Sequence, residues 1–295
     1  MLYDEENIIE NFDNLLKTDT YIKCFMGEKH KPVYKDDKMI SFVKNNNEVI
    51  IVELDEYIDN KEYYHENFEI IRIHHLTEPQ IKKCKELSIP IKYKQRLFNI
   101  IKHIDGNYLE FNGKDFRVER WNRNHYDKAG FQVETTFRKI EDVLELLSHW
   151  DKFKRSTGTL MTFTGYDKSF FKNYYEENKK KYDLLTLFFY DNDKLIAFQV
   201  MEKTSDDFWI LHTRKTDRFN YPNLNLYVDI YTFRKIWEEY GIPFYVNMGF
   251  EGYKKMTDYK IKRFTTHSRF ESYYLKLETE FTKEKTKEKI VNSLF

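Results

Sequence analysis

The sequence predicts a mixed α+β fold, in which sheets of mostly antiparallel strands are flanked by helices. Two patterns predict it: apolar and polar residues alternate in short runs between polar turns, and apolar residues recur at helical spacing between those runs. Hydrophobic residues make up 41% of the 295 residues, so a core can form. This length suits one large domain or two of ordinary size.

The N-terminal third is predicted to be a small α/β unit. Residues 5–17 carry apolar side chains at helical spacing. Residues 39–43 and 49–54 flank a polar turn and indicate a β-hairpin, and residues 68–73 indicate a strand. Thr77-Glu78-Pro79 begins a helix that reaches about residue 87, because proline suits the first turn of a helix.

The rest of the chain has a more regular pattern. Apolar stripes predict helices at 140–153, with Trp150 in the stripe, and at 168–181. Three alternating runs with tight polar turns then predict an antiparallel meander, followed by a crossover helix and further strands. The ranges are 184–190, 195–202 and 208–213 for the meander, 224–240 for a long helix ended by Gly241, 243–247 for a strand, a short helix from Gly252, and 264–277 for a last strand.

Charge and composition exclude several classes of protein. The 49 Lys and Arg residues balance the 49 Asp and Glu residues, so no global field draws the chain to nucleic acid or acidic lipid. No apolar run approaches the ~18 residues of a membrane-spanning helix, and the acidic first residues do not resemble a leader. Together with the presence of only two cysteines, these features predict a soluble, cytoplasmic protein.

The chain lacks the usual nucleotide, metal and nucleophile motifs. None of its nine glycines forms G-x-G-x-x-G or a P-loop. H-E-x-x-H, G-x-S-x-G and C-x-x-C are also absent, and His74-His75 has no third ligand at a recognisable spacing. We therefore expect no metal ion and no tightly bound cofactor.

Three short segments resemble one known family. Gly113 to Asn124 resembles G-K-K-[FY]-x-x-K-R-N-x-[IL]-N, Asp193 to Phe198 resembles G-x-x-[IV]-A-F, and Tyr245 to Lys255 resembles [YI]-[IV]-N followed by L-G-x-x-G-L-[RK]-K. These are motifs of proteins akin to the catalytic domain of phosphatidylglycerol lysyltransferase, within the GNAT-like and FemAB-like superfamily of acyl and aminoacyl transferases. The segments occur in the order that the family has.

The resemblance implies two GNAT-like modules in tandem, of which the first is degenerate. We place the modules at residues 1–111 and 112–281, and a charged tail at 282–295. Glu119 and Trp121 depart from the first motif, which usually has lysine and asparagine at these positions. These departures bear on the substrate more than on the fold.

One cationic segment precedes the helix predicted at 140–153. Arg117, Arg120, Asn124 and Lys128 recur every three or four residues and would line one stripe of a helix. With the resemblance, Arg117, Arg120 and Asn124 are expected to shape a substrate groove. The alternative is a charged face that only solvent contacts.

A second cationic segment lies near the C-terminus. Residues 251–270 carry a net charge of +4 with interleaved aromatic residues, and Lys254 and Lys255 belong to them. This mixture can bind polyphosphate or single-stranded nucleic acid. The alternative is an exposed strand whose lysines prevent edge pairing.

Transfer chemistry of the GNAT type needs a proton acceptor and a proton donor. As the resemblance implies, a primary amine attacks an activated carbonyl directly, so no covalent nucleophile is needed. His212 and Glu202 are candidate bases, Tyr253 is a candidate acid, and Asn247 belongs to the third motif. Alternatively, His212 is a hydrogen-bonded strand residue and Tyr253 a core aromatic.

The segment before residue 224 is the expected donor site. Acetyltransferases hold coenzyme A there with a glycine-rich loop, but this segment has no glycine. Arg214, Lys215 and Arg218, together with a helix N-terminus, could hold an anion instead. The sequence therefore favours an aminoacyl donor over acetyl-CoA, with acyl-CoA or aminoacyl-tRNA as the expected co-substrate.

Three functions follow from these observations. The first is a soluble N-acyl or aminoacyl transferase that passes an activated group to an amine or hydroxyl acceptor, where strands 208–213 and 243–247 splay apart. The second is a transferase, of viral type, that modifies a DNA base or a tRNA. The third is a binding module of the same fold without catalytic activity.

Overall fold

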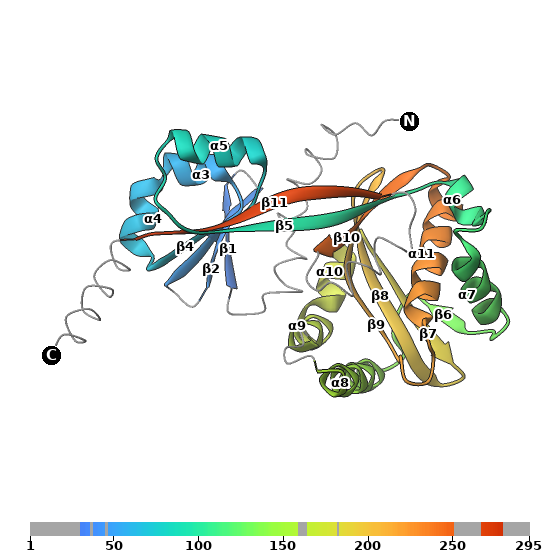
Figure 1. Ribbon diagram of the computed structural model, residues 1–295. Coiled ribbons are helices and arrows are strands. Elements are labelled where there is room, and N and C mark those ends of the chain that lie inside the picture. Colours follow the sequence, from blue (N-terminus) through green and yellow to red (C-terminus); the bar gives the residue numbers. More distant parts are fainter. Residues whose placement is uncertain are drawn as a thin grey trace. The chain divides into compact units, whose positions relative to one another are not determined.

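The computed structural model describes residues 30–35, 38–44, 47–158, 164–181, 183–250 and 267–279 (Figure 1). Their contacts divide them into two compact units. The first unit holds the described residues up to Asn99 and those from Phe270 onward, and the second holds those from Ile100 to Arg269. The helix predicted at 5–17, the short helix from Gly252 and the tail from residue 282 lie outside the described residues.

The first unit has a mixed sheet and three helices. Its sheet includes β1, β2, β3, β4 and β11 in that order; β3 and β4 are parallel and the other neighbours are antiparallel. The predicted hairpin is confirmed, because Lys44 of β2 pairs with Glu48 of β3. The bounds are β1 His30–Lys35, β2 Lys38–Lys44, β3 Glu48–Ile51, β4 Ile70–Leu76, β11 His267–Leu277, α3 Leu54–Asp59, α4 Lys61–Asn67 and α5 Glu78–Glu86.

Helix α5 begins where the sequence predicts. The backbone N–H of Thr77, the N-cap residue, donates to Oε1 of Gln80 at 2.8 Å, and Pro79 lies in the first turn. Ile81 and Cys84 of α5 are fully buried and pack against residues of β3, β4 and β11. The first unit therefore has a hydrophobic core of its own.

The second unit is built on the predicted meander. Its sheet includes β10, β9, β8, β7 and β6 in that order, and every neighbouring pair is antiparallel except β9 and β10. The mixed α+β fold that the sequence predicts is therefore confirmed. The bounds are β6 Gln132–Glu134, β7 Leu184–Asp191, β8 Lys194–Ser205, β9 Phe208–Thr216 and β10 Phe244–Phe250.

Helices cover both faces of this second sheet. Phe188 and Tyr190 of β7 pack with α8, whereas Leu187 and Phe189 pack with α11, as the two-residue period of a strand requires. Figure 1 shows α7 and α11 on one side of these strands and α8 and α9 on the other. The bounds are α6 Gly106–Glu110, α7 Arg117–Asp127, α8 Ile140–Ser156, α9 Thr164–Ser169, α10 Tyr175–Lys181 and α11 Leu224–Tyr240.

Two predicted helices of the second unit differ in their regularity. Helix α11 spans the predicted residues, and Gly241 ends it in the left-handed conformation, with φ of 68°. The helix predicted at 168–181 belongs to one continuous helical run from Thr164 to Lys181, which consists of α9, a π-helical turn at Phe170–Tyr174, and α10. A π turn holds one more residue than an α turn, and spacing rules for α-helices do not reveal it.

Two strand features were not predicted. Strand β5 (Ile91–Ile104) belongs to the first unit up to Asn99 and to the second from Ile100. Strand β9 carries a bulge at His212, because Val200 of β8 pairs with Thr213 and the next residue, Met201, pairs with Leu211. A bulge of this kind adds one residue to a strand and bends it.

The division into modules at residues 111 and 281 stays a prediction, as does the GNAT-like character of a degenerate first module. Within the described part of the chain, no helix combines the length and the apolar character needed to cross a lipid bilayer.

Candidate functional site

Strands β9 and β10 pair over only a short stretch. The parallel register runs from Tyr245 opposite Phe208 to Asn247 opposite Ile210. Strand β9 continues to Thr216 along β8, and among the described residues no pairing with β10 accompanies that continuation. The two strands thus part at the place where the sequence predicts the reaction site.

The two candidate bases are brought together beside this point. Nε2 of His212 lies 2.6 Å from Oε2 of Glu202, and their side chains are 0% and 5% exposed. Glu202 shares a sheet face with Val200, two residues before it, and Val200 packs with α8. The pair therefore lies on the α8 side, where a buried carboxylate can hold an imidazole in one orientation and exchange a proton with it.

Arg214 and Lys215 have opposite orientations, because neighbouring strand residues point to opposite faces. Arg214 forms an ion pair with the fully buried Asp229 of α11. Lys215, 10% exposed, forms an ion pair with Asp167 of α9 at 2.8 Å and donates to Oγ1 of Thr213 at 2.9 Å. The contact of Arg214 favours a structural role, whereas Lys215 lies on the same face as the Glu202–His212 pair.

Two residues of α8 that sequence reasoning did not assign to a site surround Lys215. The ammonium groups of Lys215 and Lys154 lie 4.9 and 5.1 Å from the centroid of the Trp150 ring. Burial lowers the pKa of Lys154, and the positive charges of Arg218 and Lys215 lower it further. The sequence signal for the contact between Trp150 and Lys154 was their spacing, because residues four apart on a helix lie on the same face.

Helix α7 holds the segment that precedes α11. The side-chain amide of Asn122 donates to the carbonyl of Asn223 at 3.2 Å, and the Tyr126 hydroxyl donates to the carbonyl of Pro222 at 2.7 Å. Because Arg218 and its neighbours belong to this segment, α7 helps to fix the residues at which the sequence predicts donor binding.

The predicted stripe on α7 is divided between two environments. The guanidinium of Arg120 donates to the backbone carbonyls of Phe111 and, at 2.6 Å, Gly113, so its contacts favour a structural role. Arg117 and Asn124 are exposed, and Lys128 follows the helix as its exposed C-cap. The substrate groove lined by this stripe stays a prediction.

The remaining candidates are Asn247 of β10 and three residues that follow β10 in the sequence. Asn247 is buried, and its pairing with Ile210 of β9 ends the register between the two strands. Tyr253, Lys254 and Lys255 lie outside the described residues, so their roles as acid and substrate ligands stay predictions.

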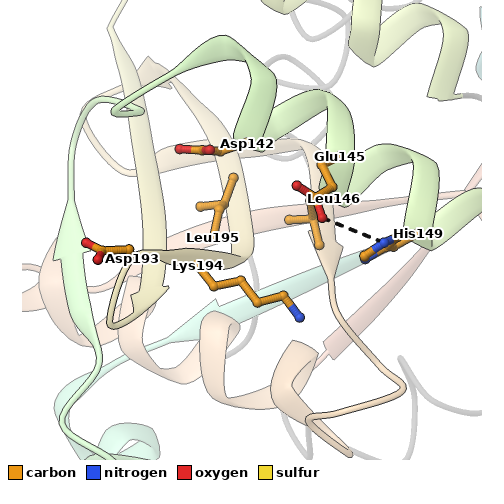
Figure 2. Close-up of a pocket in the computed structure, with 7 residues that line it drawn as sticks. All are labelled: Asp142, Glu145, Leu146, His149, Asp193, Lys194 and Leu195. Carbon is orange, nitrogen blue, oxygen red and sulfur yellow. Dashed lines mark ion pairs between the residues drawn. The ribbon is translucent and has the colours of Figure 1, made fainter.

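A surface cavity of about 310 Å³ lies between α8 and the turn joining β7 to β8 (Figure 2). Figure 2 shows Glu145 and His149 side by side at one end and Asp193 at the other. Oε1 of Glu145 lies 3.8 Å from Nε2 of His149. Its lining residues are Asp142, Glu145, Leu146, His149, Asp193, Lys194 and Leu195, and none of them was a predicted site residue.

One lining residue connects this cavity to the end of β9. Lys194 forms an ion pair with the carboxylate of Asp217 at 2.7 Å. Burial by itself would raise the pKa of Asp217, but hydrogen bonds from Lys194 and Asn220 outweigh it and lower that pKa below its usual value. Asp217 is thus a charged anchor that fixes the start of the segment between β9 and α11.

Comparison with known families identifies the second unit. Residues 103–272 match the model of a family described as phosphatidylglycerol lysyltransferase, C-terminal. The chain belongs to this family. The match contains the Glu202–His212 pair, Lys154, Lys215 and the segment before α11, and it confirms the family to which the three motifs pointed.

Several solved structures share the fold of this chain. A conserved protein of unknown function from Bacteroides thetaiotaomicron is 14% identical, with 90% of each chain covered and a TM-score of 0.65. L-PGS from Bacillus licheniformis is 10% identical, covering 93% of this chain and 92% of that one, with a TM-score of 0.58. FemX is also 10% identical, covering 93% and 96%, with a TM-score of 0.58. A search of curated proteins gave no match.

Proposed function

We propose that the second unit is an acyl or aminoacyl transferase of GNAT-like fold, which passes an activated group from a donor to an amine or hydroxyl acceptor. The observation that carries this proposal is the buried Glu202–His212 pair beside the point where β9 and β10 part. The family description, phosphatidylglycerol lysyltransferase, supports an aminoacyl ester as the donor and a hydroxyl group as the acceptor.

Glu202 is the proposed base and His212 its positioning residue. Both side chains are almost fully buried, 5% exposed for Glu202 and 0% for His212, and we assign the base to Glu202 because a carboxylate is an acceptor for the proton of an amine or hydroxyl group. The acceptor hydroxyl or amine attacks the carbonyl carbon of the donor, and a new C–O or C–N bond forms. Glu202 takes the proton that the acceptor loses and returns it to the leaving-group oxygen as the old ester bond breaks. His212 keeps the carboxylate oriented throughout.

The donor is proposed to be an aminoacyl ester, with aminoacyl-tRNA as its source. The segment from Arg214 to Asn223 contains no glycine, so a backbone cradle for the pyrophosphate of coenzyme A is disfavoured. Side chains would instead hold the donor. An acyl-CoA donor is the alternative, and the assay below distinguishes the two.

The decisive experiment offers the purified chain radiolabelled lysyl-tRNA and phosphatidylglycerol vesicles, and in parallel labelled acetyl-CoA with a primary amine. We expect label in the lipid fraction of the first reaction. Glu202→Gln should lower kcat by about 10²–10⁴-fold, the usual contribution of a positioned base, with little change in KM. Glu141→Gln, an exposed change on α8, is the matched control.

His212 needs a separate readout, because a structural role would also lower activity. His212→Gln should lower kcat and also change the pH profile of kcat, since the partner of the base is then no longer titratable. Full turnover by Glu202→Gln would refute the assignment of Glu202 as the base. Absence of turnover by the unmodified protein with either donor would instead favour a binding module without catalysis.

A further inference from the structure

Three cationic side chains gather around one indole ring in the second unit. They are Lys154 of α8, Lys215 of β9 and Arg218 of the segment that follows β9, and together with Trp150 they form what we call the cation cluster. The two ammonium nitrogens each lie about 5 Å from the centroid of the Trp150 ring, so they are no more than about 10 Å apart. Arg218 is near enough to shift the pKa of Lys154.

The two lysines of the cation cluster differ in their counter-charge. Asp167 neutralises Lys215 at 2.8 Å. Within the described part of the chain, no carboxylate lies at ion-pair distance from the Lys154 ammonium, which contacts the face of Trp150 instead. A half-buried ammonium group without a counter-charge loses hydration and is repelled by neighbouring cations, so a ligand that brings negative charge to Lys154 would be stabilised here.

The composition of the cluster matches a phosphate group. A guanidinium supplies two parallel donors to a phosphate, and ammonium groups supply compact point charges. Next to Arg218, the Phe219 ring is 61% exposed and rests on Phe153 of α8, with ring centroids 5.0 Å apart. An exposed ring beside cations offers an apolar surface to the organic part of a phosphate ester.

The position of the cluster relates it to the proposed reaction. Lys215 follows His212 by three residues on β9, which is about 10 Å at the rise of a strand. Thr213, to which Lys215 donates, pairs with Val200 and so lies on the same sheet face as Glu202. A phosphate bound at the cluster would thus lie several bonds away from a reacting carbonyl at Glu202.

We propose that the cation cluster is the subsite for a phosphate ester of the substrate. This inference rests on the proposed function and deepens it, because it names the group by which a substrate is held. Such a phosphate belongs either to a nucleotide, as part of the donor, or to a phospholipid headgroup, as part of the acceptor. Both present the same anionic chemistry to Lys154, Lys215 and Arg218.

Binding can be tested without turnover. Titration calorimetry of the full chain at low salt would use adenosine 5′-monophosphate and soluble dihexanoyl phosphatidylglycerol as separate probes. Lys154→Gln and Lys154→Met should each weaken binding of the favoured probe by about tenfold or more, as expected for loss of a charged hydrogen bond. Lys152→Gln makes the same charge change at an exposed position of α8 and should leave the Kd unchanged.

The probes identify the source of the phosphate. Tighter binding of the nucleotide assigns the cluster to the donor, and tighter binding of the lipid assigns it to the acceptor. The proposal is overturned if neither probe binds, or if Lys152→Gln weakens binding as much as Lys154→Gln does, because general surface charge would then explain the effect.

Stability separates a ligand subsite from a structural contact. Without ligand, Lys154→Gln should unfold at the same urea concentration as the unmodified protein or at a higher one, because it removes repulsion from Arg218 and Lys215. A clear loss of stability would mean that Lys154 acts by packing on Trp150. Glu202→Gln should still bind the probe, so failure of the transferase mechanism and failure of the phosphate subsite give different results.

Discussion

The two units differ in how they use buried charge. Among the described residues of the first unit, Glu48 is the one charged side chain that is buried. The second unit buries many more, and they come from both faces of its sheet: Lys102, Glu119, Asp167, Glu202, His212, Lys215, Asp217 and Asp229. Burying ions costs free energy unless each is paired, and apolar residues in their place often stabilise a fold as well. Stability alone therefore does not explain the buried charges of the second unit, and the contrast supports the proposal that places the reaction there.

The largest expected effect tests the buried pair between sheet and helix in the second unit. Asp229→Asn should lower the free energy of unfolding by about 3–5 kcal/mol, because the largely buried guanidinium of Arg214 then loses its ion pair with this carboxylate. Urea unfolding measures it. In the first unit, Glu48→Gln should lower the free energy of unfolding by a smaller amount, because Arg72 still contacts the Tyr274 hydroxyl and is partly exposed. Equal costs would remove the distinction between the units.

A smaller effect is expected at helix α7. Arg120→Ala should cost about 1–3 kcal/mol of unfolding free energy, because two backbone carbonyls lose a charged donor. The sequence alone gives Arg120 the small cost of a surface residue, so the structure revises that expectation upward. Arg117→Ala, an exposed change on the same helix, should stay within about 0.5 kcal/mol. The opposite ranking of these variants would contradict the structural role of Arg120.

The smallest effect is a pH dependence at Asp217. The pKa of this carboxyl is lower in the folded protein than its usual value of 3.8. Its contribution to stability is therefore complete above that value and is lost as the pH falls through the lower, folded-state pKa. Unfolding free energies of the protein and of Asp217→Asn, measured from pH 6 down to pH 2, should converge at the acid end. A constant difference over that range would refute the prediction.

Local patterns allowed most of the second unit to be predicted. The meander was predictable because its alternating runs are separated by polar turns, and α11 because its apolar spacing stops at Gly241. Strand β5 was not predicted, although Lys92, Lys94 and Arg96 recur at the two-residue period of a strand. Its pairing partners come from distant parts of the sequence, and no local signal contains that information.

The candidate site was predicted in part for the same reason. Glu202 and His212 were both named, but their pairing depends on how β8 and β9 align. Trp150 was assigned to a buried stripe, and its contacts with two ammonium groups depend on where β9 lies. The opposite orientations of Arg214 and Lys215 were predictable from strand parity alone, and the sequence analysis treated the two as one group.

The bulge at His212 bears on where insertions and deletions can be tolerated around β9. Downstream of it, strand parity decides that the arginine meets the acid on α11 and the lysine meets the acid on α9. Loss of the His212 codon would remove the bulge and leave Thr213 opposite Val200, whereas loss of a codon after Thr213 would turn the residues that follow it to the opposite face. Insertions and deletions in this lineage should therefore accumulate in the turns that border β9 and spare the strand itself.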